Sequence, residues 1–278
     1  MTGAGARLAA ALALAAALLG AAPGGGAAQG PGREERLTAE ALKQRLAAAS
    51  DASPPDLSGA DLSGLDLSGV DFRRANLARA RLVKTKLVKA NLFTCDLTDA
   101  VLAQADLSGA NLDGSVLRRA DLSGANLEGA SLFATILEQA NLSGANLART
   151  RIIGYLRAAN LTGANLRDAN LGADPGNQSM GVMRATFVGA DLSGADLAGA
   201  NLYKADLSYA KLANARLAGA DLGNADLIQT DFTRADLTGA NLAKADLNGA
   251  VFRAIAGRGQ IKGLDQARNR EKAIFDAQ

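Results

Sequence analysis

Between residues 73 and 89 the chain carries seven basic side chains and no acidic one. These residues, called the basic belt below, are Arg73, Arg74, Arg79, Arg81, Lys84, Lys86 and Lys89. Ammonium and guanidinium groups gathered this closely attract polyanions. The belt therefore predicts contact with an anionic membrane or envelope surface. The open alternative is a solvated basic face that discourages pairing between sheet edges.

The other chemistry-bearing residues do not form a catalytic set. The chain has no His, so it lacks an imidazole base or metal ligand. Its single cysteine, Cys95, cannot form an internal disulfide framework or a Cys-based zinc site. No glycine-rich phosphate loop precedes a helix. The sequence thus predicts no enzyme, no cofactor, no metal site and no small-molecule substrate.

Charge and aromatic content limit the class of protein further. The 30 basic and 28 acidic residues leave a net charge of +2, which suits neither a protein that coats nucleic acid nor an acidic mimic of it. Trp is absent, and 48% of the residues are hydrophobic, mostly Ala and Leu. Large aromatic side chains dominate ordinary cores, so a thin, regular core is expected instead.

A five-residue pattern runs from Pro55 to about Ala254. Each unit has a small residue, Asp or Asn, a central Leu and two variable residues, as in ADLSG at 60–64 and ANLAK at 240–244. A period of five matches neither a helix nor a flat strand. A period of five is explained if the chain bends once per unit. The small residue and the Leu then point inward, and the Asp or Asn points outward. Cys95 takes the inward small position and is expected to be an inert apolar residue.

This A(D/N)LXX array resembles the pentapeptide-repeat family over about 200 residues. The resemblance implies an all-β, right-handed quadrilateral β-helix with four units per coil and nearly ten coils. It also implies that loops leaving the coil contact partners, and that a homodimer can form through the C-terminal end. Its best-understood members mimic duplex DNA and bind DNA gyrase in the cytoplasm, which is the alternative function.

Two irregular steps interrupt the array. The step from Ile152 to Leu156 is one residue short, and the step from Leu171 to Phe187 is one residue longer than three units. Leu147 to Phe187 then spans eight whole units, so one solenoid is expected to continue through an irregular loop near 172–186. The candidate partner residues of this loop are Asp174, Asn177, Met180, Met183 and Arg184. The alternative is a tolerated insertion.

Residues 1–28 have the pattern of an export signal. Arg7 precedes an apolar run from Leu8 to Ala22, and small residues follow up to Ala28, where cleavage is expected. The run is short for a membrane span, which needs about 20 apolar residues. The prediction is a periplasmic or secreted protein; an uncleaved anchor or a disordered tail stays open.

Helical caps are expected at both ends of the solenoid, because terminal coils expose unpaired edges. Residues 29–54 contain a linker and a helix from Thr38 to Ala49 with Thr38 as N-cap. Residues 255–278 contain a second helix from Leu264 to Ala277. Within the array, Phe93 and Phe133 follow central residues and are expected outward or at a corner.

The sequence thus predicts an exported, non-enzymatic pentapeptide-repeat protein that acts as a binding or structural scaffold. Its partner is an unknown protein or an anionic envelope surface, and nucleic acid is disfavoured. Both the signal and the basic belt oppose the gyrase-binding alternative, since duplex DNA is densely negative.

Overall fold

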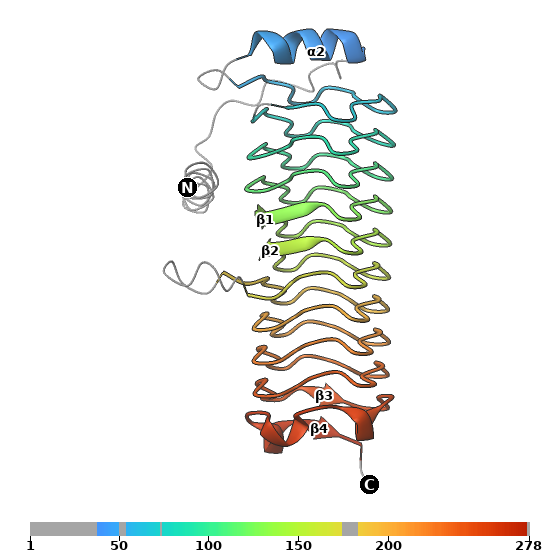
Figure 1. Ribbon diagram of the computed structural model, residues 1–278, viewed down its shortest axis with the longest axis vertical. Helices are drawn as coiled ribbons and strands as arrows, with labels where there is room; N and C mark the ends of the chain where they lie inside the picture. Colours follow the sequence, from blue (N-terminus) through green and yellow to red (C-terminus); the bar gives the residue numbers. More distant parts are fainter. Residues whose placement is uncertain (1–37, 50–53, 73, 174–182, 277–278) are drawn as a thin grey trace.

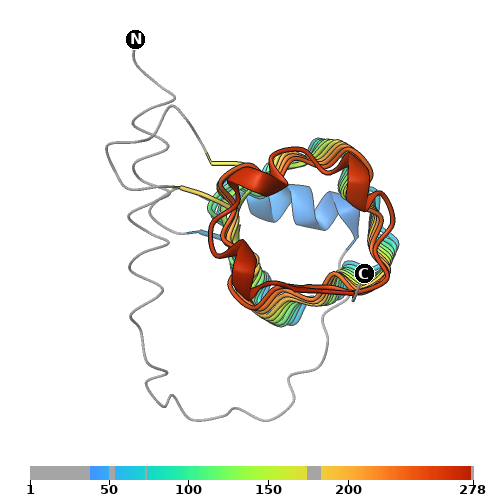
Figure 2. The same cartoon turned by 90° about the horizontal axis from the view of Figure 1, so that it is seen from below.

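The computed structural model describes residues 38–49, 54–72, 74–173 and 183–276, and the repeat winds into one four-sided rod (Figures 1 and 2). The Asp or Asn position of each unit forms a parallel bridge with the equivalent position one coil later. Asp56 pairs with Asn76, Asp61 with Arg81 and Asp66 with Lys86. A bridge every five residues and a coil of twenty residues give four sides, as predicted.

A tight turn separates one side from the next. In the first unit the Ala60 N–H donates to the Leu57 carbonyl at 3.1 Å, and Gly59 has a φ of 69°. This is the geometry of a type II turn, which needs a positive φ at its third residue. Glycine reaches this conformation without strain. Lys84 and Lys89 adopt it as well, with φ of 57° and 55°.

The interior is filled by the small residue and the central residue of every unit. Ala80 and Leu82, for example, are completely buried, and so is Cys95. Thr85, Thr135 and Thr230 occupy the small position, and each hydroxyl donates to the central Leu carbonyl of the preceding coil. Thr85 donates to Leu62 at 2.9 Å in this way. Such polar substitutions keep their hydrogen bonds and so cost little inside the core.

The outward Asp and Asn side chains serve the backbone and one another. Asn146 Oδ1 accepts from the Ala148 N–H at 3.2 Å, which supports the corner. Its Nδ2 donates to Asn126 Oδ1 at 3.0 Å, and Asn126 donates to Asp106 at 3.0 Å. The preference for Asp and Asn therefore has two causes, the turn within a coil and the ladder between coils.

Strand β2 (Arg151–Tyr155) lies at the short step. It pairs in parallel with β1 (Ser131–Ile136) of the preceding coil. Phe133 lies outside the main core, as expected for a residue that follows a central position, but its side chain is completely buried. It lies in a small cluster separate from the main core, with Ile153 beside it in register and Met183 against it. The register changes only after this pair, because Ile136 is paired with Tyr155, 19 residues later.

The count of eight units between Leu147 and Phe187 was also wrong. Asn170 pairs with Asn201, 31 residues later, eleven more than a regular coil. Leu171 and Phe187 are therefore successive central residues with an insertion between them. The solenoid does continue as one rod, as predicted. Periodicity alone cannot separate an insertion of roughly two units from two real units.

Helix α2 (Ala39–Ala48) lies across the N-terminal end of the rod (Figure 2). Thr38 is its N-cap, and the Thr38 hydroxyl accepts from the Ala41 N–H at 3.1 Å. Leu42 and Leu46 are buried in the same core cluster as the first coil. The predicted N-terminal helix is therefore present, and its apolar face covers the end of the core.

The C-terminal helix predicted from Leu264 to Ala277 is absent. The chain instead makes one more, wider coil, with bridging residues six apart at Ala256, Lys262, Arg268 and Ile274. Its elements are three 3₁₀ turns, η2 (Arg258–Gln260), η3 (Leu264–Gln266) and η4 (Arg270–Lys272), and strand β4 (Ile274–Phe275), which pairs in parallel with β3 (Val251–Phe252).

Interior stacking and backbone pairing explain this outcome. Phe232, Phe252 and Phe275 form a column with ring centroids 5.0 Å apart, and the Arg258 guanidinium covers the last ring at 4.7 Å. Offset aromatic stacking adds to the burial of apolar surface. A helix would leave the edge of the preceding coil unpaired, whereas the wide coil pairs it.

We predict that Gly263→Ala destabilises the wide coil. Gly263 has a φ of 66°, and a Cβ there would lie 2.6 Å from the Ala243 Cβ and 2.7 Å from its Cα. The expected cost is about 1–3 kcal/mol. Hydrogen exchange of residues 256–276 should become faster in this variant. Gly259→Ala is the matched control, because a Cβ at Gly259 meets nothing within 4 Å; equal exchange in both variants would contradict the prediction.

Candidate functional site

A groove of about 640 Å³ follows one corner of the C-terminal half of the rod. Its lining consists of Arg184, Lys204, Asn224, Lys244 and Arg268; these five residues are called the corner groove below. Lys204, Asn224 and Lys244 are 20 residues apart and occupy the same corner in three successive coils. All three have a positive φ, between 56° and 61°, at the turn. The repeat therefore aligns them along the rod axis.

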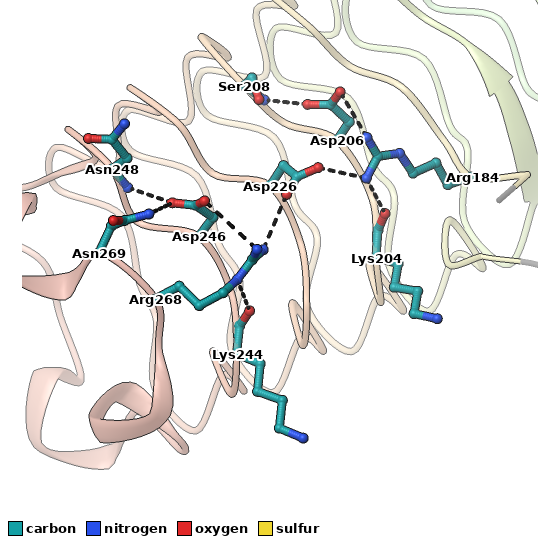
Figure 3. A network of polar contacts seen from close by, with 10 residues as sticks. All are labelled: Arg184, Lys204, Asp206, Ser208, Asp226, Lys244, Asp246, Asn248, Arg268 and Asn269. Carbon is teal, nitrogen blue, oxygen red and sulfur yellow. Dashed lines mark hydrogen bonds and ion pairs between the residues drawn. The ribbon is translucent and has the colours of Figure 1, made fainter.

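Arg184 forms one end of the corner groove. Its Nη1 contacts Asp226 Oδ2 at 2.7 Å, and its Nη2 contacts Asp206 Oδ2 at 3.3 Å. The Nη1 also donates to the Lys204 carbonyl at 3.3 Å. The guanidinium is thus held by groups from two later coils, as Figure 3 shows. Planar guanidinium groups suit such multiple contacts with carboxylates.

Arg268 makes an equivalent set of contacts at the other end. Its Nε donates to the Lys244 carbonyl at 3.0 Å, and its Nη2 contacts Asp226 Oδ1 at 3.4 Å. Asp226 therefore lies between two arginines that come from residues 42 positions before and 42 positions after it. Asn269 Nδ2 donates to Asp246 at 2.8 Å and fixes the neighbouring carboxylate.

The two lysines of the corner groove differ from the arginines. In the described part of the chain, neither ammonium group has a carboxylate partner. Figure 3 shows both side chains extending away from the aspartates. The Lys204 Nζ lies 5.4 Å from the centroid of the Tyr203 ring. Lys204 is half-buried and Lys244 is exposed, so both are available to a ligand.

Two of the predicted loop residues contact the rod. Met183 packs in the cluster of Phe133 and Ile153, and Arg184 is the end of the corner groove. On the other side of the insertion the Ala173 N–H donates to the Tyr203 carbonyl at 2.8 Å. Asp174, Asn177 and Met180 lie outside the described residues. The structure therefore joins both ends of the loop to the coils that form the corner groove.

The basic belt encircles one coil and does not gather on one face. Arg74, Arg79, Lys84 and Lys89 occupy four consecutive corners, all with positive φ. Arg81 and Lys86 lie on the sides, where Lys86 Nζ is 3.7 Å from Asp66 Oδ2. Arg73 is outside the described residues. A flat surface can therefore meet only part of the belt at a time.

Sequence reasoning did not identify Lys204, Asn224, Lys244 or Arg268. The signal that could have found the first three is their spacing of 20 residues at the second variable position. Among the described residues no group of three His, Cys, Asp or Glu is arranged to hold a metal ion. The described part of the chain also contains no helix with the length and apolarity to cross a bilayer.

The family model described as pentapeptide repeats matches residues 56–92, 95–132, 129–154, 155–172, 183–217 and 215–253. The chain belongs to the pentapeptide-repeat family. Proteins of this family fold as right-handed β-helices and are generally non-enzymatic structural or binding proteins. The matches leave out residues 173–182, where the rod has its insertion. No curated protein matches the chain.

Solved structures of other pentapeptide-repeat proteins are similar to this one. HetL from Nostoc sp. strain PCC 7120, involved in heterocyst differentiation regulation, is 29% identical and has a TM-score of 0.44; the match covers 86% of this chain and 99% of HetL. Rfr23 from Cyanothece 51142 is 28% identical over 44% of this chain and 91% of its own, with a TM-score of 0.26. Full-length QnrB1, a plasmid-mediated fluoroquinolone resistance protein, is 16% identical over 78% and 94%, with a TM-score of 0.30.

We predict that Cys95 does not react in the native protein. Burial, the largest cause, raises the pKa of its thiol to about 12. At pH 8 the thiol then stays protonated, and only the thiolate is nucleophilic. Iodoacetamide followed by mass measurement should show no adduct on the native protein and complete alkylation in guanidinium chloride. An adduct on the folded protein within minutes would contradict this expectation.

Proposed function

We propose that this pentapeptide-repeat protein is an exported, non-enzymatic binding scaffold. The observation that supports this is the separation of roles within each coil. Inward residues fill a continuous Ala and Leu core, while outward residues are held at regular intervals by the ladder between coils. Extended, rigid surfaces of this type are used by solenoid proteins to bind partners. The loop joined to the rod at residues 173 and 183 is the candidate contact element.

The alternative is a cytoplasmic DNA mimic that binds DNA gyrase. Such a mimic must carry negative charge that is not neutralised, because duplex DNA has one charge per about 1.7 Å of axis. Here many ladder carboxylates face basic side chains of adjacent coils. Examples are Asp191 with Lys211 at 3.8 Å and Asp66 with Lys86 at 3.7 Å. This neutralisation favours the scaffold over the mimic.

The C-terminal coil is where a second copy would dock in the homodimer that the family resemblance implies. Its last strand, β4, forms the outer edge of the rod, and Ile274 there is 42% exposed. An apolar side chain on an open strand edge favours pairing with another chain. This arrangement is compatible with a scaffold.

Export is tested by the intact mass of the native protein after cell fractionation. We expect a form that begins near Gln29 and lies outside the cytoplasm, because residues 1–28 have the pattern of a cleavable signal. A full-length form in the cytosol would overturn the proposed export and would bring back the gyrase-binding alternative.

The basic belt is tested by charge reversal at its four described corners. Arg74→Glu, Arg79→Glu, Lys84→Glu and Lys89→Glu together should abolish sedimentation with vesicles that contain anionic lipid, since each basic residue near such a surface contributes about 1 kcal/mol. Neutral vesicles are the control. If the quadruple variant sediments with anionic vesicles as the wild type does, the belt has no such role.

A further inference from the structure

We propose that the corner groove binds an acidic segment of a partner protein, with two carboxylates placed on Lys204 and Lys244. This inference rests on the proposed scaffold function and names the chemistry of its partner. It follows from the charges of the groove, from the spacing that the coils impose on the two lysines and from the position of the groove next to Ala173 and Arg184, which flank the insertion.

The groove contains two kinds of cation, arginines that are held by aspartates and lysines that are available to a ligand. Arg184 and Arg268 are held by Asp206, Asp226 and Asp246 at distances between 2.7 and 4.0 Å. Their charges are therefore largely balanced inside the network. The ammonium groups of Lys204 and Lys244 have no such partner among the described residues and extend away from the network (Figure 3). These two groups are the ones that an anion can reach.

The same network limits the kind of anion. Four basic side chains stand beside three aspartates, so the local surplus is a single positive charge. A densely charged polymer such as a nucleic acid would meet the three carboxylates as well as the lysines, and like charges repel. A segment with a few carboxylates between neutral residues gains the lysine contacts without that repulsion.

The spacing of the lysines matches an extended peptide. Lys204 and Lys244 occupy one corner two coils apart, which is about 10 Å at the usual 4.8 Å between strands. In a polyproline II segment, side chains three residues apart point the same way and are separated by about 9.3 Å. Asn224 lies between the two lysines. Its side-chain amide can hydrogen-bond the main chain of such a segment.

The groove also continues to the base of the loop. Arg184 is the second described residue after the loop, and Met183 before it packs against Phe133 and Ile153. The N-terminal side of the loop is bonded to Tyr203, which is adjacent to Lys204 in the chain. The described residues on both sides of the insertion therefore adjoin the corner groove.

The test uses the full chain and a fluorescein-labelled 12-residue peptide of Pro and Ala with Glu at every third position. A peptide with Gln in place of every Glu is its matched control. Binding is measured by fluorescence anisotropy at low ionic strength, where exposed ion pairs are least screened. The groove variant is Lys204→Gln with Lys244→Gln, and the control variant is Arg234→Gln with Arg253→Gln, two exposed arginines at corners outside both the groove and the basic belt.

We expect the wild type and the control variant to bind the Glu peptide equally, and the groove variant to bind about tenfold more weakly, as for the loss of two exposed ion pairs. The Gln peptide should bind no better to the wild type than to the groove variant. Thermal unfolding should be the same for all three proteins, since the changed side chains are at exposed corners or half-exposed.

Three results would overturn the inference: absence of binding to the wild type, equal loss in both variants, or displacement of the peptide by single-stranded DNA at concentrations below those of unlabelled peptide. The last result would assign the groove to nucleic acid. None of these results changes the outcome of the cell-fractionation experiment that tests export. Failure of the groove inference and failure of the proposed export are therefore distinguishable.

Discussion

Backbone pairing between successive coils is the interaction on which the whole structure depends. Each unit's outward residue forms a parallel bridge to the coil on either side, so nearly every unit repeats the same two contacts. Buried main-chain groups must be hydrogen-bonded, and this pairing satisfies them over the length of the rod. Because it also aligns equivalent residues, it creates the Asn ladders, the Thr hydroxyl contacts and the column of phenylalanine rings.

The same alignment turns residues distant in sequence into neighbours. Asp226 contacts Arg184 and Arg268, which lie 42 residues away on either side. Each arginine reaches across two coils and bonds a main-chain carbonyl on the way. The network therefore links the base of the loop to the wide terminal coil through carboxylates of the regular array. The two irregular parts of the rod are joined at one corner.

The rod departs from its regular coils at three places, which are the short step, the insertion and the wide last coil. The short step lies in strand β2, which pairs with β1 of the preceding coil. Phe133 of β1 is in the cluster against which Met183 packs, and the Arg151 guanidinium is 4.6 Å from its ring centroid. The insertion follows within one coil. The last coil widens to six residues per side, and glycine at 257 and 263 lets its backbone approach the preceding coil closely. The regular coils therefore hold these irregular segments in place.

The bend in every five residues, the inward Ala and Leu and the helix begun by Thr38 could be predicted from the residues alone, because these features depend on contacts that repeat every five residues or lie within one turn. The four sides of the coil were implied by the resemblance to the pentapeptide-repeat family. The sequence also indicated the loop, but not its length, since periodicity cannot distinguish units from an insertion. The C-terminal coil, the burial of Phe133 and the corner groove could not be predicted in this way, because each depends on which coil lies against which. The pairing of Ile274 with Val251, the packing of Met183 on Phe133 and the two contacts of Asp226 join residues whose spacing follows no short-range rule.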